Sequence, residues 1–227
     1  MESNAFLIDV FEFVILIFSL CVHESAHAWM ASRLGDQTAR MLGRVSLNPM
    51  VHVDPIGTLL LPAIMIFGPL ISAGALGGYL IGWAKPTPVN TRYFRKFVRD
   101  DNLVTLAGPV SNLLLALAAF LGKAGMVLFQ DHLPQTGTMS TSLDALWTLC
   151  GIAILVNLSL FFFNLLPIPP LDGSHLLRNM LPYNAVQTYD RIPIWVSYLL
   201  MIFVGGFILR LLLFPALGMI YFALSLV

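Results

Sequence analysis

Residues 103–122, LVTLAGPVSNLLLALAAFLG, run for twenty residues without a charged side chain. A helix of about 20 apolar residues is long enough to cross the hydrocarbon core of a bilayer. Two further stretches, residues 7–34 and 145–166, are also long and apolar. The chain is 58% hydrophobic and 11% charged, and a soluble domain of 227 residues could not bury so much apolar surface. We therefore expect an all-α polytopic membrane protein that is solvated by the lipid bilayer.

Less regular apolar segments complete the predicted architecture. Residues 56–82 are interrupted by glycine and proline, which predicts a broken or re-entrant segment. Residues 192–226 contain similar breaks and predict a hydrophobic helical hairpin or two short helices. The polar stretch ARMLGRVSL, residues 39–47, predicts short β-strands near the motif described below. In total we expect about five to six transmembrane helices in a single domain, residues 1–227, whose core covers about residues 7–180.

Basic residues predict which ends of the spans face the cytosol. Arg33, Arg40 and Arg44 follow the first span, and residues 83–102 form the most basic loop, so both regions should be cytosolic. Residues 56–82 must then enter the membrane and return, because a single crossing would place these two regions on opposite sides. The sequence PIPPLDG at the end of a later span consequently lies on the same side as the end of the first span.

The first span contains HESAH, which matches the motif H-E-x-x-H. His23 and His27 are four residues apart and share one face of a helix, so both imidazoles can bind one zinc ion. Glu24 lies beside them and can accept a proton from a water molecule at the metal. The alternative is that these side chains only pack between helices. Ionisable residues inside a membrane are rare and usually functional, which favours the metal site.

A catalytic zinc site needs a third protein ligand. Asp172, in PIPPLDG, lies on the predicted side of the membrane and follows prolines that end the helix. An Asp-Gly pair is equally typical of a turn, so the residues alone leave both interpretations open. His52 and Asp54 are rival ligands, although His52 could as well support the loop that contains it. His175 is more typical of a surface residue.

The motifs together resemble the site-2 protease family of intramembrane zinc metalloproteases. The resemblance rests on HESAH in the first span and NLLPIPPLDG after a later one, and it covers about residues 20–180. The blocks GRVSLNPMVHVDPIGTLLLP, GWAKPTPVN and LAGPVSN are similar to the compact bacterial and archaeal branch. No soluble stretch is long enough for the PDZ or CBS domains that some members carry. The resemblance implies a multi-pass protein of a prokaryotic plasma membrane, with an active site open to the cytosol.

The resemblance also implies roles for individual residues. The implied zinc ligands are His23, His27 and Asp172. Glu24 would be the general base, and Asn164 would hold substrate or stabilise the oxyanion. Asn112, in AGPVSN, matches a second asparagine of the family. Each asparagine could instead form an interhelical hydrogen bond, which is common in membrane proteins.

The implied reaction is hydrolysis of peptide bonds within or near the transmembrane segments of membrane-protein substrates. Such a substrate must unwind locally, and an extended segment of the protease could bind the unwound strand by β-addition. The stretch WAKPTPVN, residues 83–90, suits this role because its prolines keep it extended, although it could also be a plain interhelical loop.

Two other functions are compatible with histidines and carboxylates in membrane helices. A divalent-metal transporter would also carry them, but transporters usually contain internal repeats, and none is visible in this sequence. A non-catalytic membrane scaffold could keep a degenerate site, yet both motifs are complete. The formal net charge is zero, so no basic field predicts nucleic-acid binding. The sequence does not determine the oligomeric state.

Overall fold

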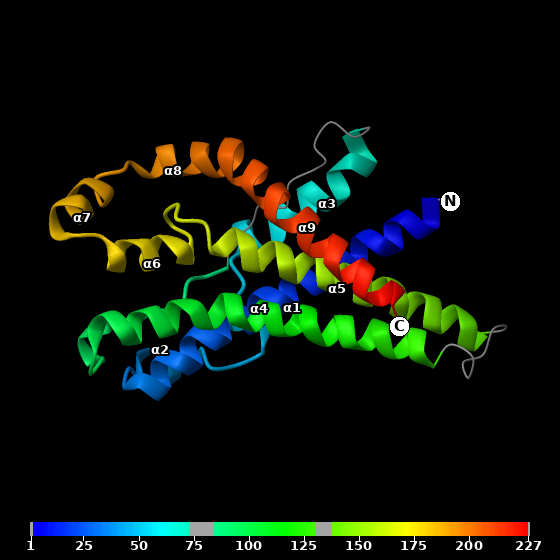
Figure 1. Cartoon of the computed structure of the whole chain (residues 1–227), viewed down its shortest axis with the longest axis horizontal. Helices are drawn as coiled ribbons and strands as arrows, with labels where there is room; N and C mark the ends of the chain where they lie inside the picture. The colour runs from blue at the N-terminus through cyan, green and yellow to red at the C-terminus, as the bar shows by residue number, and fades with distance from the viewer. Residues whose placement is uncertain (1, 73–83, 130–137, 227) are drawn as a thin grey trace.

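The computed structural model describes residues 2–72, 84–129 and 138–226, and all regular structure within these ranges is helical (Figure 1). Four helical runs are long and apolar enough to cross a membrane: α1 (Glu2–Leu34), α4 (Phe97–Leu128), α5 (Thr138–Asn164) and the run Ile194–Ser225. The predicted helical membrane protein is confirmed. The predicted five to six spans are not, since the described residues contain four.

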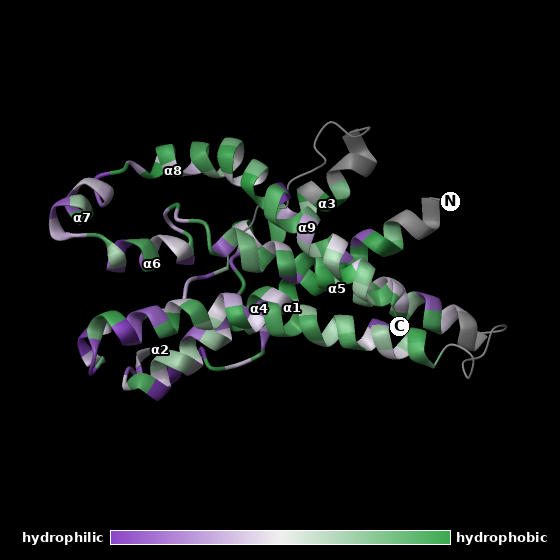
Figure 2. Ribbon diagram, in the orientation of Figure 1, coloured by the Kyte–Doolittle hydropathy of each residue, from purple (hydrophilic) through white to green (hydrophobic). Residues whose placement is uncertain are grey.

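Helices α1, α4 and α5 form the centre of the fold, with α4 packed against both of the others (Figure 1). Buried apolar side chains join these helices in two clusters. One consists of Leu16, Leu20 and Val156, and the other of Ala116, Ile154 and Leu158. Apolar residues also cover much of the outer surface of the helices (Figure 2). Such a surface is stable in lipid, where apolar side chains need not be hidden from water.

The predicted strands at residues 39–47 are wrong. The chain there forms the short helix α2 (Thr38–Met41) and a turn, and the 3-10 turn η1 (Pro49–Val51) follows. Gly43 adopts a φ of +71°, a left-handed conformation that suits glycine, and this ends the helix. No described segment pairs with this stretch as a strand, so its backbone is satisfied by turns instead.

The apolar segment after this loop begins with the π-helical turn η2 (Pro55–Leu60) and continues as α3 (Leu61–Ser72). Asp54, a rival metal ligand, caps η2 by accepting hydrogen bonds from the N–H groups of Ile56 and Gly57 at 3.0 and 2.7 Å. The predicted return of this segment falls on residues 73–83, outside the described residues. Re-entry therefore remains a prediction.

The C-terminal quarter consists of α6 (Asp172–Met180), α7 (Tyr183–Tyr189), α8 (Ile194–Leu200), the π-helical turn η5 (Met201–Gly205) and α9 (Gly206–Ser225). The last three form one continuous helical run rather than the predicted hairpin (Figure 1). Gly205 and Gly206 keep helical backbone angles, and the helix widens there without ending. Glycine permits a break in a helix but does not impose one.

Candidate metal centre and its surroundings

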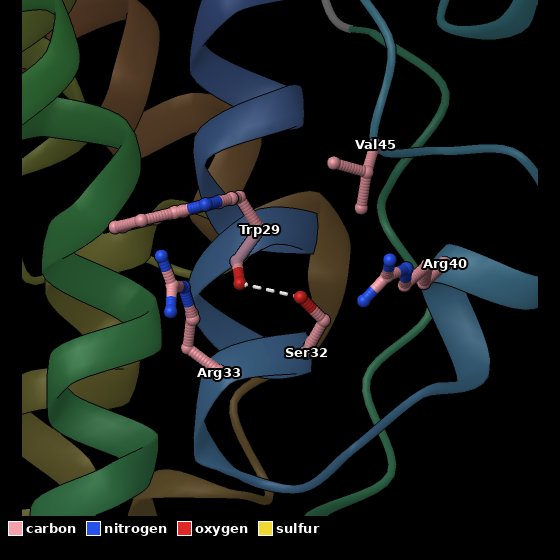
Figure 3. Close-up of a pocket in the computed structure, with 5 residues that line it drawn as sticks. All are labelled: Trp29, Ser32, Arg33, Arg40 and Val45. Atoms are coloured by element: carbon pink, nitrogen blue, oxygen red, sulfur yellow. Dashed lines mark hydrogen bonds between the residues drawn. The ribbon is translucent and has the colours of Figure 1, made fainter.

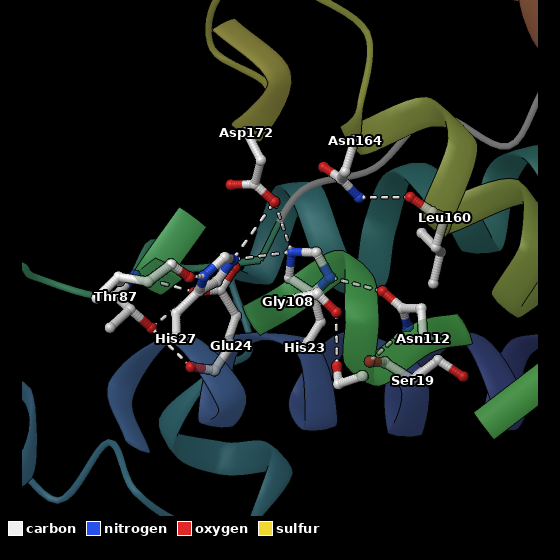
Figure 4. A network of polar contacts seen from close by, with 12 residues as sticks. Ser19, His23, Glu24, His27, Thr87, Gly108, Asn112, Leu160, Asn164 and Asp172 are labelled. Carbon is white, nitrogen blue, oxygen red and sulfur yellow. Dashed lines mark hydrogen bonds and ion pairs between the residues drawn. The ribbon is translucent and has the colours of Figure 1, made fainter. Parts of the chain in front are cut away.

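Three side chains from two distant parts of the chain converge on one another (Figure 4). His23 and His27 point from α1, and Asp172 reaches them from the first turn of α6. The Nε2 atoms of the two histidines are 3.0 Å apart, and Asp172 Oδ2 lies 3.1 Å from His23 Nε2 and 3.4 Å from His27 Nε2. Both histidines are buried, and the Asp172 side chain is 20% exposed.

These distances match a tetrahedral zinc site. Ligands at roughly 2.0–2.1 Å from a tetrahedral ion lie about 3.3 Å from one another. The three observed separations, 3.0, 3.1 and 3.4 Å, are close to that edge length. A fourth, non-protein position is what a catalytic zinc site requires. The separations between the ligand atoms therefore fit a catalytic zinc ion.

The Nδ1 atoms of both imidazoles, which face away from the cluster, are each hydrogen-bonded to an acceptor. His27 Nδ1–H donates to the Val104 carbonyl at 2.7 Å, and His23 Nδ1–H donates to Asn112 Oδ1 at 2.6 Å. With Nδ1 protonated, a neutral imidazole has its lone pair on Nε2, which faces the other histidine and Asp172. Three acceptor atoms thus converge, an arrangement that suits a bound cation.

Asn157, on α5, is a contributor that the sequence analysis missed. Its Oδ1 accepts a hydrogen bond from Asn112 Nδ2 at 3.0 Å, and its Nδ2 donates to the Ala153 carbonyl at 2.9 Å. Asn157 and Asn112 are 2% and 0% exposed. The pair fixes the orientation of the Asn112 amide and therefore which atom it presents to His23. An asparagine in the middle of an apolar span was the signal that could have revealed it.

Two glycines allow the close approach of the elements that form the site. A Cβ on Gly108 of α4 would lie 2.5 Å from His23 Nε2 and still closer to His27 Nε2. A Cβ on Gly173 would lie 2.5 Å from the Leu166 carbonyl oxygen, and it would also collide with the carbonyl of Leu165. Any larger residue would push α4 or α6 away from the cluster. The glycine of LAGPVSN and the glycine of LDG therefore both serve packing.

The end of α5 and the start of α6 determine where Asp172 lies. The prolines after α5 end that helix, and Leu171 adopts an extended conformation before α6 begins at Asp172. A carboxylate in the first turn of a helix is favoured by the helix dipole. The ordinary pKa of an aspartate is about 3.9, and the helix dipole favours the charged form here, so Asp172 presents an anionic acceptor to the two imidazoles.

Glu24 contacts the loop that precedes α4 and lies beside His27 (Figure 4). Its Oε2 accepts hydrogen bonds from the Thr87 N–H at 3.0 Å and from the Thr87 hydroxyl at 2.7 Å. Thr87 belongs to the predicted extended segment, but the sequence assigned no role to this residue itself.

Three other residues considered in the sequence analysis, Asn164, His52 and His175, are not among the three clustered ligands. Asn164, at the end of α5, lies on the same side of the cluster as Asp172, and its Nδ2 donates to the Leu160 carbonyl of its own helix at 2.9 Å (Figure 4). His52 is 1% exposed and does not join the cluster. Its Nε2–H donates to the Ser46 carbonyl at 2.7 Å, so it supports the loop after α1. His175 is exposed.

Comparison with known proteins agrees with this site. The model of Peptidase family M50 matches residues 11–206. "Putative zinc metalloprotease YwhC" of Bacillus subtilis (strain 168) is 42% identical over 170 residues, which are 74% of this chain and 68% of that protein. "Putative zinc metalloprotease Rip2" of Mycolicibacterium smegmatis is 34% identical over 167 residues, and the match covers 71% of this chain but only 54% of that protein. No solved structure matches the chain significantly. The chain belongs to peptidase family M50, the site-2 protease family of zinc-dependent metalloproteases.

Proposed function

We propose that the chain hydrolyses peptide bonds within or near the transmembrane segments of membrane proteins, with zinc held by His23, His27 and Asp172. The observation that carries this proposal is the set of three acceptor atoms at the edge length of a zinc tetrahedron. The placement of His23 and His27 within the long apolar helix α1 supports an intramembrane reaction.

In the proposed mechanism the residues of the chain move one proton twice. Zinc, when bound, supplies a Lewis acid that polarises the scissile carbonyl and makes water a stronger acid. The Glu24 carboxylate accepts a proton from the attacking water and later delivers it to the leaving amine. The Nδ1–H groups of His23 and His27 donate to Asn112 and Val104, which leaves the Nε2 lone pairs to hold zinc.

Asn164 and Asn112 have different proposed roles. Asn164 donates from Nδ2 to its own helix, so its Oδ1 is the atom available to a substrate N–H. Turning the side chain would instead present Nδ2 to a developing oxyanion. Asn112 supports His23 and is buried beneath it, so we assign it to metal positioning and not to substrate binding.

The positions of basic residues support a site that opens towards the cytosol. A hollow at the C-terminal end of α1 is lined by Trp29, Ser32, Arg33, Arg40 and Val45 (Figure 3). The Arg33 guanidinium lies 5.3 Å from the centre of the Trp29 ring, and such pairs are typical of membrane interfaces. His27 and Arg33 are six residues apart, which is about 9 Å of helix. Water from the basic, cytosolic face would therefore have only a short path to the site.

Purified protein in detergent tests the proposal directly. A single-span peptide should be cleaved by the parent, and a chelator should abolish cleavage, which added zinc should restore. Glu24→Gln should bind zinc like the parent and cleave nothing measurable, because an amide cannot accept the proton. Cleavage by Glu24→Gln at the parent rate would disprove the role of Glu24. Metal uptake into vesicles without any peptide cleavage would instead favour a transporter, an alternative that the family membership does not support.

A further inference from the structure

The segment of residues 84–90 is held against the region of α1 at both of its ends. The Lys85 N–H donates to the His52 carbonyl at 2.8 Å. The Asn90 N–H donates to the Asp36 carboxylate at 2.6 Å. His52 is 1% exposed and Asp36 is 0% exposed, so both anchors belong to the rigid interior. The position of this segment is thus determined independently of the catalytic residues.

Thr87 lies between these two anchors and is flanked by prolines. Pro86 and Pro88 have fixed φ angles, and each proline also restricts the residue before it to extended backbone. Thr87 therefore has few conformations available. Its N–H and its hydroxyl both reach Glu24 Oε2, at 3.0 and 2.7 Å. The hydroxyl oxygen also lies 3.1 Å from the Glu24 carbonyl, but its single proton serves the closer, charged acceptor.

We infer that Thr87 is a positioning residue for Glu24, an inference that rests on the proposed general-base role of Glu24. Two donors on one restrained segment hold Oε2, and among the described residues no hydrogen bond occupies the other carboxylate oxygen, which can therefore face the attacking water. A glutamate has three rotatable side-chain bonds, and fixing them before reaction removes an entropic part of the barrier. The contribution specific to threonine is the hydroxyl, because any residue except proline would supply the N–H.

The test compares two substitutions at this position. Thr87→Val keeps the branched shape and the N–H but removes the hydroxyl, and Thr87→Ser keeps the hydroxyl. The matched control is Thr91→Val, in the following 3-10 turn η3 (Thr91–Tyr93). For each variant, kcat and KM are measured on a single-span peptide, together with the zinc content and the thermal unfolding temperature.

We expect Thr87→Val to lower kcat by about 10- to 100-fold, the range for one hydrogen bond to a charged group. KM, zinc content and unfolding temperature should stay close to the parent, and Thr87→Ser should recover most of kcat. Thr91→Val should behave like the parent.

The inference is overturned if Thr87→Val retains the parent kcat, or if Thr87→Ser is as impaired as Thr87→Val. It is also overturned if Thr87→Val loses zinc or raises KM in proportion to its loss of kcat, because Thr87 would then act on the fold or on substrate binding. Glu24→Gln, assayed in parallel, separates this failure from that of the proposed function. An inactive Glu24→Gln beside a fully active Thr87→Val would disprove only the inference.

Discussion

Helix α4 contributes to two clusters around ionisable side chains, and the two are chemically opposite. Near its middle, Gly108 and Asn112 lie under His23 and His27, where three acceptor atoms converge. Near its C-terminal end, Lys123 is 5% exposed, and its Nζ lies 4.1 Å from the centre of the Trp147 ring. The second cluster contains its own cation, which aromatic faces stabilise. The first consists of acceptors and contains no cation of its own among the described residues, and this difference supports its proposed role as the metal site.

Removal of one acceptor is expected to have the largest effect on the first cluster. Asp172→Ala should weaken zinc binding by more than the roughly 10- to 100-fold that loss of a supporting hydrogen bond causes. The measurement is zinc per chain after dialysis against a weak chelator. Asp144→Ala, which removes an exposed carboxylate of α5, is the control and should retain zinc. Parent-like zinc content in Asp172→Ala would exclude Asp172 as a ligand.

A methyl group at Gly108 should disturb the same cluster by steric contact. The new Cβ in Gly108→Ala would lie 2.5 Å from His23 Nε2, so the imidazoles or α4 must shift. We expect loss of most of the zinc and an unfolding free energy lower by roughly 1–3 kcal/mol. Gly125→Ala on the same helix has open space around the new Cβ and should keep both properties. Equal zinc content and equal unfolding free energy in the two variants would show that α4 does not pack against the histidines as described.

Removal of Asn157, which orients the Asn112 amide, should have a smaller effect on zinc binding. Asn157→Leu keeps a similar volume but leaves Asn112 Nδ2 with the Ser19 carbonyl, 3.4 Å away, in place of Asn157. The orientation of Asn112 is then less well defined, and we expect zinc affinity to fall by about tenfold. Competition with a chromophoric chelator measures this change. An unchanged affinity would mean that Asn112 holds His23 without help from α5.

A substitution in the second cluster, around Lys123, should have the smallest effect on stability and no effect on zinc binding. Trp147→Leu removes an aromatic face from Lys123 and should lower stability by about 1 kcal/mol. The same substitution in a Lys123→Met background should cost less, because no cation remains to be stabilised. Thermal unfolding of the four proteins in one detergent gives the coupling. Loss of zinc from Trp147→Leu would contradict the independence of the two clusters.

The sequence predicted the parts of the site that depend on local spacing and on membrane topology. Four-residue spacing alone places His23 and His27 on one face of α1. Charge counting placed Asp172 on their side of the membrane, and the structure brings it within 3.4 Å of both histidines. Neither inference needed any knowledge of how the helices pack.

The supporting contacts could not be predicted, because they depend on the rotation and depth of each helix. The carbonyl that holds His27 belongs to Val104, whose side chain gives no hint of that role. Thr87 reaches Glu24 only because two remote anchors place its segment there. The predicted strands at residues 39–47 failed for a related reason, since a strand needs a partner, and the sequence does not show whether one is present.

X-ray absorption at the zinc edge of the purified protein identifies the atoms that hold the metal. We expect one zinc per chain with two imidazole nitrogens and one or two oxygens at about 2.0–2.1 Å. In Asp172→Asn the zinc that remains should show an altered oxygen shell beside the same two imidazoles. A sulfur neighbour at about 2.3 Å, or a zinc shell without imidazole, would contradict the assignment of His23, His27 and Asp172 as the metal site.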